Sequence, residues 1–333
     1  MSKNTGNVIR AFACALLAAF FVLQAGTVQA QSKMRIAFGD VAAIESLHFL
    51  AAIERAKERG VDVEVTFLQA EDIAAQAVVG GQMDIGIGAP YALIQKVKAP
   101  IRMFAQLSTL RFFPVVNSEF YKTWEDLNGQ EIAVHARGSG TEAIMQLMAD
   151  VHNIEYASIS YVPGSEVRAG ALLQGNIKAS IVDAANRRFL EQQAPGKFIV
   201  LPLGDIAATD EALFANTDYL AANSGDVDIL VEELLLSIRE VADDPAAAVE
   251  MRKKYNLLPD LGEAANEEIL AYFKETADAD AMPVNGGAAA AAQDDFAFYT
   301  IAGQLEGEAS SLNVADFWDL GPLERVLNKI GTR

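Results

Sequence analysis

Hydrophobic and polar positions along this chain follow two periods in turn, and the alternation predicts a series of α/β units. Short apolar segments at residues 34–38, 61–68 and 83–87 have the length and composition of β-strands. Between them, residues 44–59 and 72–79 carry apolar side chains at the spacing of an amphipathic helix. Strands that alternate with helices indicate a parallel sheet with helices on its faces.

Part of this series occurs twice. Residues 70–87 (AEDIAAQAVVGGQMDIGI) align without a gap with residues 164–181 (GSEVRAGALLQGNIKASI). The second copy predicts further strands and helices at 131–135, 141–152, 157–162, 166–173 and 178–183. A chain that repeats one α/β unit is expected to build two similar lobes with a ligand cleft between them.

Two further regions are expected to connect the lobes. The β-rich runs at 101–107 and 113–117 lie between the copies, and an apolar run at 197–203 follows the second one. The predicted organisation is therefore lobe 1 from residues 31–112 and 208–333, with lobe 2 from 113–207. Helices are expected at 227–242, 246–255 and 263–274, and another begins in the alanine run 288–292. Segment 278–333 has no predicted role beyond packing of Trp318 against a lobe.

The N-terminus has the pattern of a secretory signal peptide. Lys3 and Arg10 precede an apolar run at 11–23, and small residues lead to a cleavage site after Ala30. Cys14 is the only cysteine, and its sequence context lacks the pattern for lipid attachment. We therefore expect an exported, soluble product of residues 31–333 that has neither a disulfide nor a thiol.

Charge and residue types limit the possible partners and chemistry. Loss of Lys3 and Arg10 leaves 24 of the 26 basic residues against 45 acidic ones, a net charge of −21. Nucleic acid and anionic membranes are therefore poor partners. His48, His135 and His152 do not have the spacing of a metal site, and no carboxylate pair indicates acid–base catalysis. We expect no metal, no cofactor and no catalytic residue.

The clearest local motif is R-G-S-G-T-E at 137–142, which follows a predicted strand and opens a predicted helix. Backbone N–H groups at a helix N-terminus attract anions. Arg137 can add a charge-assisted hydrogen bond, Ser139 and Thr141 add hydroxyls, and Gly140 allows close approach. Ser139 or Thr141 can also cap the helix, which is compatible with binding.

Other candidates lie at the carboxyl ends of predicted strands, where open α/β sheets bind ligands. By position they are Asp40, Ala89, Tyr91, Asp183, Asn186 and Arg187. Each also suits a turn or a helix cap. At the predicted crossover, Arg111 can clamp an anion and Phe112 can stack on it. The alternative is an exposed arginine beside core aromatic residues.

These motifs carry a family resemblance. G-x-x-D-I-G-I-G-A-P at 81–90, W-E-D-L-N-G-Q-E-I-A-V at 124–134, R-G-S-G-T-E, and L-L-Q-G-N-I-K-A-S-I-V-D at 172–183 occur in order. The chain resembles periplasmic substrate-binding proteins of ABC importers, in the branch for nitrate, sulfonates, taurine and thiamine pyrimidine precursors. The resemblance implies a type II periplasmic-binding-protein fold of two α/β lobes joined by two crossing segments. It also implies ligand contacts near Asp40, Ala89, Arg111, Ser139–Thr141 and Asp183.

The resulting hypothesis is a freely diffusing periplasmic monomer that captures a small organic anion, a sulfonate or a carboxylate, and delivers it to an inner-membrane ABC permease. An aromatic ligand is included because Phe112 and Tyr91 are near the candidate loops. The alternatives are an enzyme or a sensor on the same fold that handles a pyrimidine-like ligand.

Overall fold

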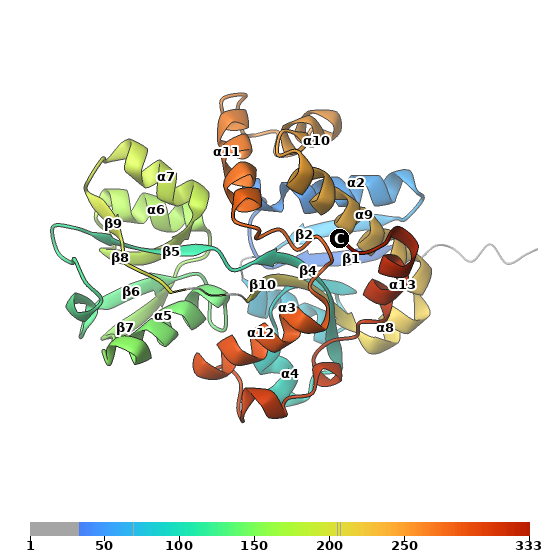
Figure 1. Cartoon of the computed structure of the whole chain (residues 1–333), viewed down its shortest axis with the longest axis horizontal. Helices are drawn as coiled ribbons and strands as arrows, with labels where there is room; N and C mark the ends of the chain where they lie inside the picture. Colours follow the sequence, from blue (N-terminus) through green and yellow to red (C-terminus); the bar gives the residue numbers. More distant parts are fainter. Residues whose placement is uncertain (1–32, 69, 205, 207) are drawn as a thin grey trace, which may run out of the picture. The chain divides into compact units, whose positions relative to one another are not determined.

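The computed structural model describes residues 33–68, 70–204, 206 and 208–333. The predicted signal peptide, with Cys14, lies outside the described residues. From Met34 to Arg333 the chain forms one compact unit built on two five-stranded sheets (Figure 1). Within the described residues, no helix is both long enough and apolar enough to cross a membrane.

The first sheet, the basis of lobe 1, has the strand order β2-β1-β3-β10-β4. Strand β1 pairs in parallel with β2 and β3, whereas β10 runs antiparallel between β3 and β4. The strands are β1 (Met34–Phe38), β2 (Val63–Phe67), β3 (Ile85–Gly88), β4 (Ile101–Thr109) and β10 (Thr209–Asn216).

The second sheet, the basis of lobe 2, has the order β7-β6-β8-β5-β9. Its strands are β5 (Phe112–Asn117), β6 (Glu131–Val134), β7 (Ser158–Tyr161), β8 (Ala179–Asp183) and β9 (Phe198–Val200). The two sequence copies form β2-β1-β3 and β7-β6-β8, which have the same order and are parallel throughout.

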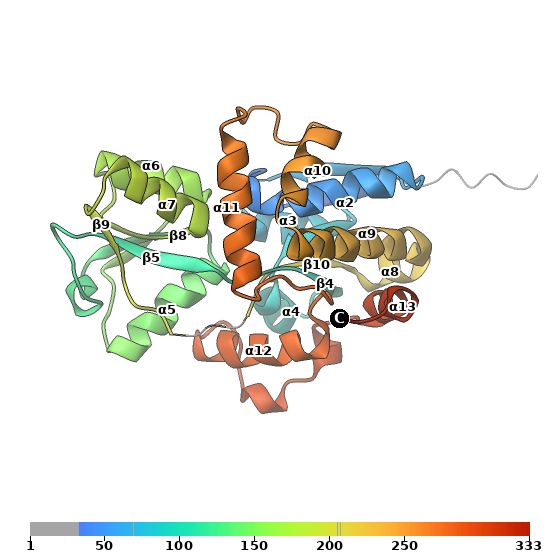
Figure 2. The same ribbon diagram turned by 45° about the horizontal axis from the view of Figure 1, so that its top comes forward.

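Helices cover both faces of each sheet (Figures 1 and 2). In lobe 1, α2 and α9 pack together on one face, while α3, α4 and α12 lie on the other. In lobe 2, α5 lies opposite α6 and α7. The helices of lobe 1 are η1 (Ile44–Ser46), α2 (Leu47–Glu58), α3 (Glu71–Val79), α4 (Tyr91–Val97), α8 (Thr217–Ala222), α9 (Ser224–Asp243), α10 (Ala247–Tyr255), α11 (Ala265–Asp278), α12 (Ala288–Ile301), η3 (Ala309–Ser311), η4 (Val314–Asp316) and α13 (Gly321–Ile330). Those of lobe 2 are η2 (Glu125–Leu127), α5 (Gly140–His152), α6 (Ser165–Gln174) and α7 (Ala184–Gln193).

The chain crosses between the sheets twice. It leaves lobe 1 at Leu110 and Arg111, between β4 and β5, and returns between Val200, the end of β9, and Thr209, the start of β10. Two α/β lobes joined by two crossing segments confirm the predicted fold class. The exact lobe boundaries stay a prediction.

Strand β10 and helices α7 and α8 have no counterpart in the sequence prediction. Strand β10 begins Thr209-Asp210-Glu211, and two adjacent carboxylates hide the alternation expected of a strand. Helix α7 (AANRRFLEQQ) buries only Ala184 and Leu190, so its apolar stripe is too thin to recognise. Strand β10 and helix α7 place polar residues at the interface between the lobes.

Two glycines allow close packing where the site forms. A side chain at Gly86 on β3 would overlap the ring of Phe214 on β10. A side chain at Gly140, the first residue of α5, would overlap Leu110 in the first crossing. Gly140 therefore lets the start of a lobe 2 helix approach the hinge.

Candidate functional site

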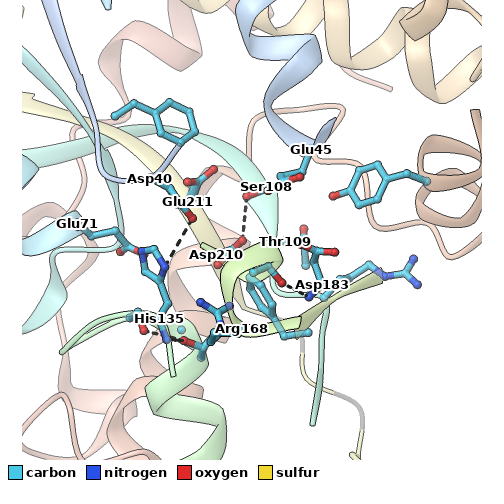
Figure 3. Close-up of a pocket in the computed structure, with 18 residues that line it drawn as sticks. Asp40, Glu45, Glu71, Ser108, Thr109, His135, Arg168, Asp183, Asp210 and Glu211 are labelled. Atoms are coloured by element: carbon cyan, nitrogen blue, oxygen red, sulfur yellow. Dashed lines mark hydrogen bonds and ion pairs between the residues drawn. The ribbon is translucent and has the colours of Figure 1, made fainter. Parts of the chain in front are cut away.

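A cavity of about 60 Å³ lies where the strand ends of both lobes meet the crossing segments (Figure 3). Residues from η1, α3, α11 and β10 of lobe 1 and from α5, α6 and β8 of lobe 2 line it. The volume is enough for roughly four or five water-sized groups, so the lobes are closed on a small space.

The lining of this cavity is strongly acidic. Six carboxylates contribute to it, together with two guanidinium groups, Arg111 and Arg168. Figure 3 shows the carboxylates arriving from both lobes and from the returning strand β10. The six are Asp40, Glu45, Glu71, Asp183, Asp210 and Glu211.

Asp210 and Glu211 stand at the start of β10, directly after the second crossing. Ser108 Oγ donates a hydrogen bond to Asp210 Oδ2 at 3.5 Å. Burial, followed by the charge of Asp40, raises the pKa of Asp210 to about 7. Burial and the neighbouring Asp210 raise the pKa of Glu211 well above its usual range. Each would gain most from a ligand that brings positive charge.

Glu45 and Glu71 approach from lobe 1. Glu71 is the first residue of α3, and its Oε2 accepts a hydrogen bond from the Ala89 N–H at 3.4 Å. Burial and the charge of Asp210 raise the pKa of Glu71 to about 8. Burial and the charge of Asp183 raise the pKa of Glu45 well above its usual range. Part of the acidic lining is therefore protonated at neutral pH in the empty cavity.

Asp40 and His135 meet across the two lobes. Asp40 Oδ2 lies 3.6 Å from His135 Nδ1, which accepts a hydrogen bond from the Gly164 N–H at 3.3 Å. Burial, with a smaller effect from the Arg168 charge, lowers the pKa of His135 to about 4. The imidazole is thus neutral at neutral pH and does not offset the charge of Asp40.

Arg168 is the buried cation of the site, with 1% of its surface exposed. Its Nε donates to the Ile181 carbonyl at 2.9 Å and its Nη1 to the Val162 carbonyl at 2.8 Å. Burial lowers its pKa, and the nearby charge of Asp40 opposes that shift. Backbone carbonyls therefore fix this guanidinium in the wall of the cavity.

Asp183 caps helix α7, and hydrogen bonds with Asn186 and Ser165 fix its position. Its Oδ1 accepts from the Asn186 N–H at 2.7 Å and its Oδ2 from Asn186 Nδ2 at 3.0 Å. Its own N–H donates to Ser165 Oγ at 2.9 Å. Asn186 therefore positions Asp183 and does not line the cavity itself.

Arg111 lines the cavity, but its charge is directed at α11. Its Nη2 donates to the Glu275 carboxylate at 3.0 Å and its Nη1 to the Glu275 carbonyl at 2.9 Å. Arg187 and Arg188 of α7 also pair with Glu275. This cluster joins the lobes and leaves Arg111 less available to clamp a ligand anion.

In the loop predicted to bind an anion, the hydroxyl groups form hydrogen bonds with the backbone of the same loop. Ser139 Oγ donates to the Ala136 carbonyl at 2.7 Å, and Thr141 Oγ1 accepts from the His135 N–H at 3.0 Å. A Cβ on Gly140 would lie 3.5 Å from Asp210 Oδ1. A carboxylate of the protein thus lies beside the helix N-terminus where the ligand's anion was expected.

Aromatic rings complete the cavity. Phe38 ends β1, Phe112 begins β5, and Tyr272 belongs to α11. Ring faces attract organic cations, particularly when carboxylates stand beside them. The combination of rings and carboxylates suits a protonated nitrogen better than a sulfonate.

The structure brings together a little over half of the predicted site residues. The cavity is lined by Asp40, Arg111, Phe112, Ser139, Gly140, Thr141 and Asp183. Five others do not line it: Ala89, Tyr91, Arg137, Asn186 and Arg187. Tyr91 is fully buried in the lobe 1 core, where its hydroxyl donates to Asp295 and accepts from Trp318 Nε1. Arg137 is exposed, with its guanidinium 4.9 Å from the centre of the Tyr161 ring.

Several lining residues escaped the sequence analysis. The most important are Glu45, Glu71, Arg168, Asp210, Glu211 and Tyr272. Glu71 and Arg168 lie within the repeated segment, so strand-end geometry alone could have drawn attention to them. Among the described residues, no group of three or more His, Cys, Asp or Glu side chains is arranged to hold a metal ion.

Comparison with known proteins assigns the family. The family model described as NMT1/THI5-like matches residues 47–248, more than half of the chain. The chain belongs to the NMT1/THI5-like family. Among curated protein sequences, none matches this NMT1/THI5-like protein.

Solved structures show the same fold at low sequence identity. A ligand-binding component of an ABC-type import system from Staphylococcus aureus, with zinc bound, has a TM-score of 0.66 at 13% identity, covering 89% of this chain and 99% of that one. The periplasmic nitrate-binding protein NrtA from Synechocystis has a TM-score of 0.69 at 12% identity, covering 91% and 90%. The alkanesulfonate-binding protein SsuA from Xanthomonas axonopodis, bound to MOPS, has a TM-score of 0.61 at 16% identity, covering 86% and 98%. The NMT1/THI5-like chain therefore has the periplasmic-binding-protein fold.

Proposed function

We propose that this protein is the substrate-binding component of an ABC importer, that it works in the periplasm, and that its ligand is a small organic cation. The fold and the family support the carrier role, since one solved protein of the same fold is named as the ligand-binding component of an ABC-type import system and another as a periplasmic nitrate-binding protein. The partner that receives the ligand would be an inner-membrane permease. The carrier would be a binding protein and not an enzyme.

The observation that carries the ligand class is the acidic cavity. Six carboxylates line it, while Arg111 is paired with Glu275 and Arg168 is held by backbone carbonyls. A protonated amine, amidine or aminopyrimidine would satisfy several carboxylates and stack against Phe38, Phe112 or Tyr272. An anion would be repelled by each of these carboxyl groups that is ionised.

This differs from the organic anion expected from sequence. That expectation rested on the helix N-terminus at Gly140 and on cleft-edge arginines, among them Arg137 and Arg111; Arg111 is paired with Glu275. Arg137 lies outside the acidic cavity, and Asp210 lies beside Gly140. A cation is therefore the better-supported ligand of the acidic cavity. A sulfonate or carboxylate in that cavity is the competing hypothesis.

A thermal-shift panel tests the ligand class. We would compare amines, quaternary ammonium ions, guanidines, amidines and aminopyrimidines with sulfonates, carboxylates and nitrate. A ligand at 100 times its Kd stabilises the folded state by about 2.7 kcal/mol. We expect at least one small cation to raise the melting temperature through binding in the acidic cavity.

Two variants test whether the shift in melting temperature comes from binding in the acidic cavity. Glu211→Gln should abolish most of the shift, whereas Glu267→Gln, an exposed change on α11, should retain it. Absence of a shift with every cation of the panel, or a cation shift that is equal in wild type and Glu211→Gln, would refute the cation assignment. Recovery of the bound compound chemically unchanged after incubation separates a carrier from an enzyme.

A further inference from the structure

A second cavity lies along the interface between the lobes and has a different character. Its volume is about 300 Å³, and it lies between α3 and α4 of lobe 1 and the loop after β6 of lobe 2. We call it the apolar groove. Its walls are mostly hydrocarbon, from Ala75, Ala89, Pro90, Leu93, Val97 and Phe214.

Two cations stand at this groove, Lys96 from α4 and Arg137 from the lobe 2 loop. Both are exposed, and no carboxylate among the described residues forms an ion pair with either. The Arg137 guanidinium rests over the Tyr161 ring, so its donors stay available. Unpaired cations are notable in a chain with 45 acidic residues.

Two acidic residues also touch the groove, and they do not cancel this charge. Glu71 lines both cavities and forms the wall between them. Its pKa of about 8 leaves it mainly protonated at neutral pH. Asp72 is the remaining carboxylate, and its Oδ1 already accepts a hydrogen bond from the Ile73 N–H at 2.9 Å. Two cations against this one carboxylate leave the groove with a net positive edge beside an apolar floor.

We propose that the apolar groove is a second small-molecule site, which takes an organic anion with a compact aromatic or branched aliphatic body. The body would lie against Leu93, Val97 and Phe214, and its sulfonate or carboxylate would face Lys96 and Arg137. The volume is at the lower end of the range for small-molecule pockets. Since the two cavities have opposite charge preference, a simple anion would favour the apolar groove and a simple cation the acidic cavity.

This inference is independent of the ligand proposed for the acidic cavity. It rests on residues on the far side of Glu71, and Lys96, Arg137 and Leu93 do not line the acidic cavity. Failure of one assignment therefore leaves the other standing, and the experiments use different probes.

A matched pair of fluorescent probes tests the groove. The sulfonate 1-anilinonaphthalene-8-sulfonate and its neutral parent N-phenyl-1-naphthylamine differ only in the anion. We expect the sulfonate to bind the full mature chain at pH 7.5 more tightly than the neutral probe. The double variant Lys96→Gln/Arg137→Gln should weaken the sulfonate about tenfold and leave the neutral probe within about twofold.

The control variant Lys122→Gln/Lys253→Gln removes the same charge at exposed positions elsewhere, and it should bind the sulfonate like wild type. Ala92→Trp, which fills the groove from α4, should exclude both probes while circular dichroism shows a folded chain. Glu211→Gln in the acidic cavity should not change either affinity. Sulfonate binding that is unchanged by both the double variant and Ala92→Trp would overturn the proposal.

Discussion

Glu71 and Asp210 keep protons in the pH range where ordinary carboxyl groups are ionised. An unfolded carboxyl group titrates near pH 4, whereas these two titrate at about 8 and about 7 in the folded protein. From pH 4 upward the folded state therefore binds more protons than the unfolded state. Stability must fall as pH rises through that interval. His48 and His135 act in the opposite direction only below about pH 6.5, because their folded pKa values are about 4.

We therefore predict that the ligand-free protein loses stability between pH 6.5 and pH 8.5. The slope is up to about 1.4 kcal/mol per pH unit for each proton retained. Glu71→Gln should flatten this slope, because its side chain does not titrate, and Glu267→Gln should not. Urea unfolding at several pH values measures the effect. A stability that rises with pH in both wild type and Glu71→Gln would contradict the assigned protonation.

At the same scale, the sequence indicated some site residues and missed others for a physical reason. Asp40, Ser139 and Asp183 follow strands of the repeat, so topology alone places them at the cleft. Asp210 and Glu211 lie at the start of β10. As two adjacent charged residues, they interrupt the alternation of apolar and polar positions by which a strand is recognised. Arg137 was expected at the ligand because a sequence motif does not reveal side-chain direction, and its side chain turns toward Tyr161.

Helix α11 is the element that holds the two lobes together on one side of the cavity. It packs against η1 and α9 of lobe 1 and also contacts α7 of lobe 2. Glu275 on α11 pairs with Arg111, Arg187 and Arg188, and Glu268 pairs with Arg188 at 2.5 Å. These side chains are partly exposed, so each pair contributes modestly and the network matters more than any one pair.

Glu275→Gln should shift the ligand-free protein toward an open arrangement of the lobes, because three guanidinium groups lose their shared carboxylate. The radius of gyration from small-angle X-ray scattering should increase relative to wild type, and added salt should open wild type in the same direction. The control is again Glu267→Gln on the same helix. An unchanged radius in Glu275→Gln would show that apolar contacts alone keep the lobes closed.

Element prediction succeeded where hydrophobic period and length agreed. The repeated strands and helices, together with α9, α10 and α11, appear within a few residues of their expected positions. Elements with few buried side chains failed: α7 buries two residues and α8 buries one. The position of α7 depends on its contact with α11 across the interface between the lobes, which no local pattern contains.

At the scale of the whole molecule, the C-terminal segment is part of the core of lobe 1. Asp295 of α12 accepts hydrogen bonds from the Tyr91 hydroxyl and from the Thr209 N–H, the latter at 2.6 Å. Trp318 Nε1 donates to the Tyr91 hydroxyl at 2.8 Å, and Tyr299 donates to the Thr209 carbonyl at 2.9 Å. Thr209 opens β10, so this network fixes the strand at the point where the chain returns from lobe 2. The expected packing of Trp318 against a lobe is seen.

Tyr91→Phe should lower the free energy of unfolding by about 2 kcal/mol, because it takes away the acceptor of the buried Trp318 N–H and one of the two hydrogen bonds to Asp295. Urea unfolding measures this loss, with Tyr255→Phe at a more accessible position as the control. Probe binding to the apolar groove should persist, since Tyr91 does not line it. A loss below about 0.5 kcal/mol would mean that water replaces the hydroxyl.

The position of β10 between β3 and β4 also decides the order in which the chain can complete its parts. Lobe 2 is one uninterrupted stretch, from β5 to β9, and contains all of its own sheet. Lobe 1 cannot close its sheet until residues 209–216 are available, and α12 must follow to fix them. When the chain emerges from its N-terminus onward, the later-encoded lobe is thus the first that can mature. The earlier half must wait with an open gap between two strands, and that exposed gap is where a chaperone would be needed most.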